Sequence, residues 1–141
     1  MTSMAPYLHF DGKAEEAMKC YKSIFGGSFK ILQRYKDMAG GMKISEEDQD
    51  RIIHISLLLD NGITLMASDF LSSMEMQVNP SNNFHICIQA ENEQEADKLF
   101  SEISDGGRID MPLNRTFWGD YFGMCSDKFG VQWMINGSNN K

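Results

Sequence analysis

The sequence predicts an α+β fold made of two copies of one βαβββ unit. The segment EAMKCY at residues 16–21 returns as EADKLF at residues 95–100, and a pair of glycines closes each copy, Gly26-Gly27 and Gly106-Gly107. Alternating apolar segments, which are typical of strands, flank both copies. A repeat on this scale marks a supersecondary unit that buries its apolar face beside its copy. We therefore expect a curved mixed sheet with a cleft, and helices on its convex face.

The first unit is expected to cover residues from about 5 to 69. Residues 7–10 alternate and end at Asp11-Gly12, which indicates a strand and a turn. A helical apolar pattern then runs to Gly26-Gly27, where glycine allows the backbone of a helix end. Strands are expected at 29–35, 51–59 and 63–68, the last two around Asp60-Asn61-Gly62, a strong hairpin signal. The polar residues 37–50 predict a solvated loop, with a flap over a ligand as the alternative.

The second unit is expected at about residues 83–137, after a connection at about 70–82 that is rich in Ser and Asn. Residues 84–90 alternate cleanly and predict a strand. Asn92 and Glu95 form a plausible capping pair at the start of a helix. Further strands are expected near 108–110, 116–125 and 131–136. The whole chain, residues 1–141, is expected to form a single domain.

Charge and composition exclude several classes of protein. The net charge is −7, and the 13 basic residues are scattered and outnumbered by 20 acidic ones, which argues against a nucleic-acid partner. No segment approaches the ~18–20 apolar residues of a membrane span, and the first residues lack the pattern of a signal peptide. Cys20, Cys87 and Cys125 are odd in number and lie in apolar patterns, which predicts reduced, mostly buried thiols. We therefore expect a cytoplasmic protein without a membrane or nucleic-acid partner.

Strand alternation assigns side chains to the two faces of the predicted sheet. Leu8 and Phe10 are expected to pack on the helices, which places Tyr7 and His9 in the cleft. The same reasoning places a larger set in the cleft: His54, Ser56, Thr64, Met66, Ser68, His85, Cys87, Gln89, Gln132, Met134 and Asn136. All three histidines of the chain belong to this face, which favours a functional site there.

Ordered blocks over nearly the whole chain resemble a known family. They are residues 6–17 with Tyr21 and Phe25-Gly26-Gly27, residues 65–69, Gly107 with Met111-Pro112-Leu113, residues 116–120 and residues 127–134. In these blocks the chain resembles the vicinal-oxygen-chelate superfamily, which includes glyoxalase I, extradiol dioxygenases and bleomycin-resistance proteins. Within it the chain is most similar to the PhnB-like branch, also named 3-demethylubiquinone-9 3-methyltransferase-like. The resemblance implies a homodimer. The chain has no glycine-rich strand-to-helix turn that would seat a nucleotide cofactor, so the name is not carried over as an activity.

The resemblance also implies where a metal would lie. Metal-dependent members use four inward residues, typically His or Gln, Glu, His and Glu, which correspond here to Tyr7 or His9, Met66, His85 and Met134. Thioethers thus replace both carboxylates, and neutral, soft methionine does not offset the charge of Zn, Ni, Fe or Mn as anionic oxygen does. We predict no divalent metal and no other cofactor. A zinc site rebuilt from His9, His54 and His85 is the alternative.

Two hypotheses of function follow. In the first, the cleft binds a small apolar or aromatic molecule on adaptable methionine side chains. In the second, the protein is a glyoxalase- or dioxygenase-type enzyme that uses His85 as a base or as part of the rebuilt metal site. The missing carboxylates favour binding. Asp69 is expected either to orient a polar group of the ligand or to cap a turn. The predicted ligand-binding residues are His9, His54, Met66, Asp69, His85, Trp118 and Met134.

Overall fold

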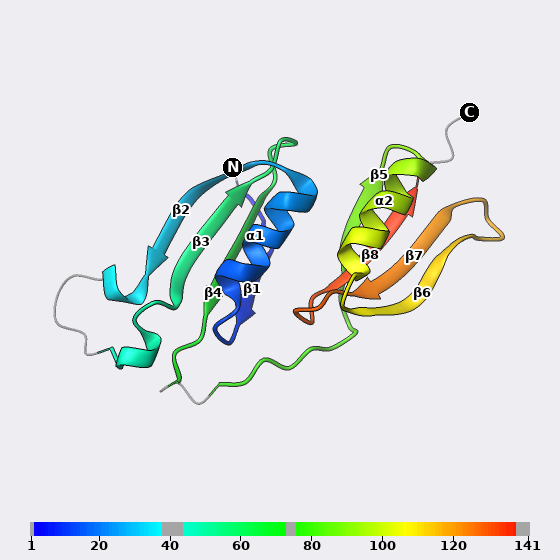
Figure 1. The fold of residues 1–141 in the computed structure, drawn as a ribbon. Helices are drawn as coiled ribbons and strands as arrows, with labels where there is room; N and C mark the ends of the chain where they lie inside the picture. The colour runs from blue at the N-terminus through cyan, green and yellow to red at the C-terminus, as the bar shows by residue number, and fades with distance from the viewer. Residues whose placement is uncertain (1, 38–43, 73–75, 138–141) are drawn as a thin grey trace. The chain divides into compact units, whose positions relative to one another are not determined.

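A computed structural model describes residues 2–37, 44–72 and 76–137 of the chain. The chain divides into two compact units, Met1–Val78 and Asn79–Lys141. In each unit, one α-helix lies across one face of a four-stranded mixed sheet (Figure 1). The predicted pair of βαβββ units is confirmed, and the boundary between them falls within the predicted connection.

The described residues of the first unit contain one α-helix and four strands. Its elements are β1 (Tyr7–Phe10), α1 (Ala14–Phe25), β2 (Ser28–Arg34), β3 (Ile52–Leu58) and β4 (Thr64–Asp69), with short 3₁₀ helices at Tyr35–Asp37 and Glu46–Asp48. The strand order is β1-β4-β3-β2, in which β1 and β4 are parallel and the other pairs antiparallel. Residues 38–43 of the predicted loop, for which a flap was the alternative, lie outside the described residues.

The second unit repeats this arrangement. Its elements are β5 (Ile86–Ala90), α2 (Glu93–Ser104), β6 (Arg108–Arg115), β7 (Tyr121–Ser126) and β8 (Gln132–Gly137). The strand order is β5-β8-β7-β6, with β5 and β8 parallel. The capping pair is confirmed, because Asn92 accepts a hydrogen bond from the Glu95 N–H at 2.8 Å and Glu95 accepts one from the Glu91 N–H at 2.8 Å.

Three details of the second unit differ from prediction. The strand predicted near 108–110 extends to Arg115, and it carries Pro112 at the edge of the sheet, where proline removes no ladder hydrogen bond. The strand predicted from Thr116 starts only at Tyr121, because Thr116 N–H binds the Asp120 carbonyl and closes a turn. The strand predicted at 84–90 starts only at Ile86, and Phe84 before it is 64% exposed.

Alternation separates most core residues from the opposite face of each sheet, although Ser56 and Gln132, which were expected in the cleft, are buried. The helix α1 buries Ala14, Ala17, Met18 and Tyr21 against the sheet residues Ile55, Leu57, Leu65 and Ala67. The helix α2 buries Ala96, Phe100 and Ile103 in a core that includes Cys125, Trp133 and Ile135. Each unit therefore has its own apolar core between one helix and one sheet.

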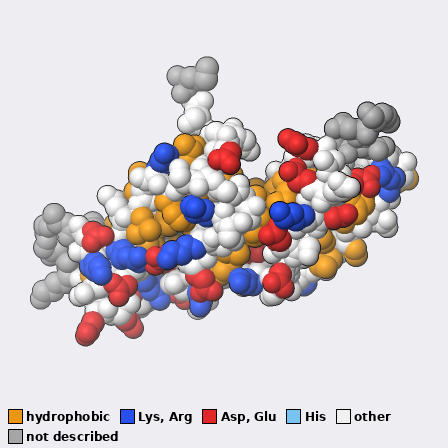
Figure 2. Space-filling model, turned by 45° about the horizontal axis from the view of Figure 1, so that its top comes forward, with side chains coloured by type: hydrophobic (Ala, Val, Ile, Leu, Met, Phe, Trp, Pro, Cys, Tyr) orange, Lys and Arg blue, Asp and Glu red, His pale blue; other side chains and the backbone are white. Residues whose placement is uncertain are grey.

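The surface agrees with the charge pattern of the sequence. On the face that Figure 2 shows, Lys and Arg side chains lie among Asp and Glu side chains and form no broad basic patch. Among the described residues, no helix is both long enough and apolar enough to cross a membrane.

An ion pair joins α1 to the end of β2. Arg34 donates to both carboxylate oxygens of Glu15, at 2.9 and 2.8 Å, and Lys19 lies 3.1 Å from the same carboxylate. The hydrogen bond from Arg34 is the main cause that lowers the pKa of Glu15 from its ordinary 4.5 to about 2. Because the pKa is depressed in the folded state, the stabilisation is complete above about pH 5 and is lost as the pH falls towards 2.

We expect Glu15→Gln to lower the free energy of unfolding by about 1 kcal/mol at pH 7, as for a partly exposed bidentate pair. Urea unfolding at pH 7, 5, 3 and 2 measures the difference from the unsubstituted protein, which should vanish near pH 2. Glu16→Gln is the matched control. The side chain of Glu16 is 59% exposed, and its single ion pair, with Lys13, is long at 3.6 Å. A difference that persists unchanged at pH 2 would contradict this account.

Candidate functional site

The sheet face opposite α1 carries most of the predicted site residues of the first unit. Strand register pairs Tyr7 with Met66 and His9 with Ser68. His54 belongs to the same face, because its ring contacts Tyr7. The intervening residues Leu65 and Ala67 are buried on the other side. We call Tyr7, His9, His54, Met66 and Ser68 the His–Tyr face.

Tyr7 joins the two histidines of this face. Its hydroxyl lies 3.0 Å from Nδ1 of His54, so its side chain crosses β4 to reach β3. The Tyr7 ring centroid is 5.2 Å from that of His9 and 5.6 Å from that of His54. His9 stacks on Phe70 with ring centroids 5.2 Å apart and planes 5° apart. Four rings therefore form a continuous aromatic surface.

The polar atoms of these histidines have a defined arrangement. Nδ1 of His9 is 3.3 Å from the Ser68 hydroxyl, and Nδ1 of His54 faces the Tyr7 hydroxyl. When these hydroxyls donate, each neutral imidazole carries its proton on Nε2. Within the described parts of the chain, neither Nε2 atom has a hydrogen-bond partner. In that tautomer the face offers two N–H donors to a ligand.

The His–Tyr face is accessible. Tyr7 is 40% exposed, His9 is exposed, and His54, Met66 and Ser68 are partly buried. The structure therefore brings together three of the predicted ligand-binding residues, His9, His54 and Met66. Tyr7, which was not among them, lies on the same face. Their roles in ligand binding stay predictions.

Asp69 does not belong to this face. Its side chain is 3% exposed and accepts hydrogen bonds from the N–H groups of Gly12, Ala14 and Ile52 at 2.9–3.0 Å. The Tyr35 hydroxyl also donates to the Asp69 carbonyl, and burial raises the pKa of that tyrosine. Both oxygens of the Asp69 carboxylate therefore accept backbone hydrogen bonds, two of them from the turn and the first residue of α1. This agrees better with the alternative that Asp69 caps a turn than with ligand binding.

The corresponding face of the second unit is rich in sulfur. Cys87 pairs with Met134, Met134 with Met124, and Met124 with Met111, so these side chains occupy one row across four strands. The prediction of a buried thiol at Cys87 is wrong, because β5 is an edge strand and the side chain is exposed. His85 is partly buried and lies just before β5.

Trp118 lies at the turn between β6 and β7. It is 60% exposed, its Nε1–H donates to Asp120 at 2.7 Å, and its ring meets Phe117 edge-on at 4.7 Å. Phe117 is 97% exposed, so the turn presents two aromatic rings to solvent. Asp120 orients the Trp118 ring through this hydrogen bond. The two residues are only two positions apart, so this contact could have been predicted from the sequence.

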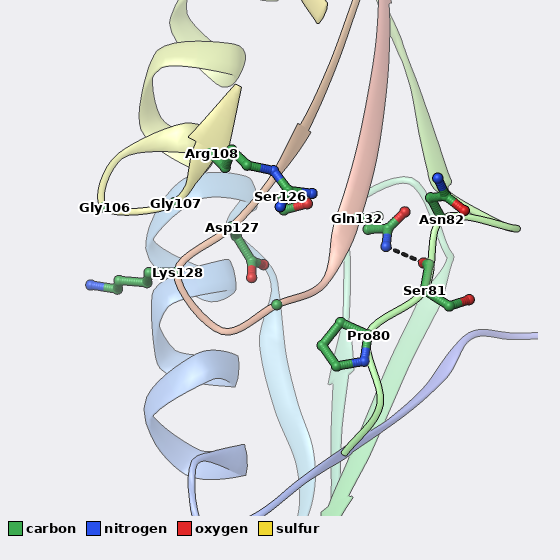
Figure 3. A pocket seen from close by; sticks show the side chains of 11 residues that line it. Pro80, Ser81, Asn82, Gly106, Gly107, Arg108, Ser126, Asp127, Lys128 and Gln132 are labelled. Atoms are coloured by element: carbon green, nitrogen blue, oxygen red, sulfur yellow. Dashed lines mark hydrogen bonds between the residues drawn. The ribbon is translucent and has the colours of Figure 1, made fainter. Parts of the chain in front are cut away.

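A pocket of about 580 Å³ opens at the end of the second unit where β6 begins (Figure 3). Its lining includes Pro80, Ser81, Arg108, Asp127, Lys128 and Gln132. Gln132 donates from its amide to the Ser81 carbonyl, and Asp127 accepts from the Trp133 indole at 2.8 Å, while the Lys128 side chain extends away from Gln132. These polar groups mainly hold the local chain together, and none of the predicted ligand-binding residues lines this pocket.

The donor atoms do not fit the divalent metal that the superfamily implies. The four metal-binding positions of the superfamily correspond here to Tyr7 or His9, His85, and the thioethers Met66 and Met134. Within the parts of each unit that are described, no three His, Cys, Asp or Glu side chains lie close enough together to hold an ion. A hard or borderline divalent ion would lack the anionic oxygen that stabilises it.

The fold is shared with solved structures. A glyoxylase/bleomycin resistance protein/dioxygenase domain from Frankia sp. EAN1pec matches 100% of this chain and 96% of its own, with a TM-score of 0.66 and 10% identity. A likeness at this identity shows the fold alone, which is that of the vicinal-oxygen-chelate superfamily.

Closer relatives place the chain within that class. The chain belongs to the family described as 3-demethylubiquinone-9 3-methyltransferase, whose model matches residues 2–136. Protein PA1353 from Pseudomonas aeruginosa is 32% identical, with a TM-score of 0.84 over 96% of this chain and 97% of that one. The PhnB protein of Bacillus cereus is 30% identical, with a TM-score of 0.76 over 95% of this chain and 98% of its own. The predicted PhnB-like branch is confirmed.

Proposed function

We propose that this protein binds a small aromatic molecule on the His–Tyr face, without a divalent metal ion. The observation that carries the proposal is the continuous surface of Tyr7, His9, His54 and Phe70. Aromatic rings favour offset or edge-on contacts with another ring, at about 0.5–1.5 kcal/mol for each pair. Met66 adds an adaptable, polarizable contact in the same row as Tyr7.

The two imidazoles give this surface directional contacts. A ligand with a carbonyl, carboxylate or phenolic oxygen beside its ring can accept from Nε2–H of His9 or His54. Ligand sites typically combine an apolar wall with a few fixed polar groups of this kind. We therefore expect aromatic compounds that carry an oxygen acceptor to bind better than aromatic hydrocarbons of the same size.

Methyl transfer is not proposed, although the family description names it. The two strand-to-helix turns of the described residues are 11–13 and 91–92, and each has at most one glycine. A nucleotide-type cofactor of the doubly wound class is held by several glycines at such a turn. The proposal therefore rests on binding without a resident cofactor.

One contact favours an enzyme as the second candidate. The Tyr7 hydroxyl and His54 are in hydrogen-bond contact, and such a pair can move a proton to or from a bound substrate. The acid–base group would then be His54, whereas sequence reasoning selected His85. An NMR spectrum of the bound compound over several hours distinguishes the candidates, because a binder returns it unchanged and an enzyme converts it.

We expect 4-hydroxybenzoate and benzamide, used as aromatic probes, to shift the NMR signals of Met66, His9 and His54. Tyr7→Leu should weaken binding about tenfold, which corresponds to about 1.4 kcal/mol. Phe117→Leu is the matched control, since it removes a 97% exposed ring in the other unit.

Cyclohexanecarboxamide and cyclohexanecarboxylate are the saturated controls for the two probes. Equal affinity for the saturated and aromatic compounds would contradict the proposal. So would an equal loss of binding in Phe117→Leu and Tyr7→Leu.

A further inference from the structure

Four sulfur-bearing side chains lie next to one another across the sheet of the second unit. They are Cys87, Met134, Met124 and Met111, one from each strand, and we call them the sulfur row. The row lies on the face opposite α2, because Gly123, the neighbour of Met124 on β7, is the residue that approaches Phe100 of the helix. Neighbouring strands are about 4.8 Å apart, so adjacent side chains of the row are within mutual reach.

The members of the row are reachable from solvent. Cys87 is exposed, Met134 and Met124 are partly buried, and Met111 is 46% exposed. Cys125 provides the contrast, because it lies on the helix side of β7 and burial raises its pKa to about 11. Cys87 is therefore the thiol of this unit that a ligand from solvent can reach.

The chemistry of the row selects one class of ligand. A thiolate and two thioethers are soft donors, which prefer Cu(I) to the harder divalent ions. The row contains no carboxylate, so it offers nothing that would hold Mg²⁺, Mn²⁺ or Ca²⁺.

We propose that the sulfur row binds one Cu(I) ion through Cys87, Met134 and Met124. The Cys87 thiol loses its proton to water as the sulfur–copper bond forms, and each methionine donates a sulfur lone pair. Copper remains in the +1 state, so no electron is transferred. Met134 is the central ligand, since Cys87 and Met124 flank it on either side. This site is independent of aromatic binding on the first unit.

An anaerobic titration of the full chain with Cu(I), in competition with the chelator bicinchoninate, tests the proposal. We expect one equivalent to bind tightly. Cys87→Ser should weaken binding at least 100-fold, and Met134→Leu, which keeps the volume and removes the sulfur, about tenfold. Cys20→Ser is the matched control, because Cys20 is a partly buried thiol on α1 of the other unit.

Equal losses in Cys87→Ser and Cys20→Ser would show adventitious thiol binding and overturn the proposal. Unchanged affinity in Met134→Leu would overturn it as well. A second readout needs no variant. One equivalent of Ag(I), a redox-inert substitute for Cu(I), should shift the methyl NMR signals of Met134 and Met124 and leave that of Met18, a buried residue of α1, unmoved. Signals of Met134 and Met124 that stay in place would contradict the site.

Discussion

Gly107→Ala is expected to unfold the second unit, and it is among the largest stability effects that the structure predicts. A Cβ atom at Gly107 would overlap the carbonyl oxygen of Ser126 and lie 2.7 Å from the carbonyl carbon of Asp127. Both groups are backbone atoms next to the pairing of Arg108 with Ser126, so they cannot move without breaking the β6–β7 ladder. We expect a loss of at least about 3 kcal/mol, measured as the unfolding midpoint by circular dichroism.

The repeat provides a second test of the same cause. Gly27 occupies the equivalent position before β2, where a Cβ atom would overlap the carbonyl oxygen of Leu58. Gly27→Ala should therefore damage the first unit in the same way. Gly62→Ala is the control, because its Cβ would meet nothing within 4 Å and only its positive φ of 89° costs about 1–2 kcal/mol. Similar losses at Gly62 and Gly107 would show that the close approach is not the cause.

Asp69→Asn is expected to lower the free energy of unfolding by about 3 kcal/mol, because it removes charge-assisted hydrogen bonds and leaves a buried donor unpaired. The carboxylate accepts from Gly12 and Ala14 through Oδ1 and from Ile52 through Oδ2. An asparagine amide can keep one oxygen in place, but its NH₂ group then faces another N–H donor. Chemical denaturation of the full chain measures the loss.

Asp60→Asn is the matched control for this change, since Asp60 is exposed in the turn between β3 and β4. It should change the stability by less than about 0.5 kcal/mol. If Asp69→Asn were as mild as Asp60→Asn, the carboxylate would not be the anchor of the turn before α1. It would then again be a candidate ligand-binding group.

Much of the fold follows from local patterns in the sequence. The alternation of Tyr7, Leu8, His9 and Phe10 settles which residues share a face, because the period of two in a strand needs no knowledge of its neighbours. The paired glycines mark the ends of both helices and the close approach of β2 and β6 to their partners. These features depend on short segments of the chain, so they can be predicted from the sequence.

The contacts that build the site depend on strand order and register. The Tyr7–His54 hydrogen bond joins residues 47 positions apart and requires β4 to lie between β1 and β3. The sulfur row requires the register of three strand pairs, and the exposure of Cys87 requires knowledge of what covers its face of the sheet. None of these follows from local periodicity, which explains why Tyr7, Phe70 and Met124 were missing from the predicted ligand-binding residues.

The difference at Asp69 has a similar origin. Alternation alone places Asp69 on the core side of β4, but an ionisable residue next to an apolar strand also resembles a ligand-binding group. Only the fold shows that β4 ends beside both the start of α1 and the start of β3, where the N–H groups of Gly12, Ala14 and Ile52 need an acceptor. A buried carboxylate with this many backbone donors is a structural residue.

The most direct test of the central claim is an aromatic titration of metal-stripped protein. After treatment with a chelator, elemental analysis should show no divalent metal, and 4-hydroxybenzoate should still shift the signals of Met66, His9 and His54. Addition of one equivalent of Zn(II), Ni(II) or Mn(II) should leave the affinity of the protein for 4-hydroxybenzoate unchanged. Binding that appears only after a divalent ion is added, or that leaves Met66 unaffected, would contradict the account.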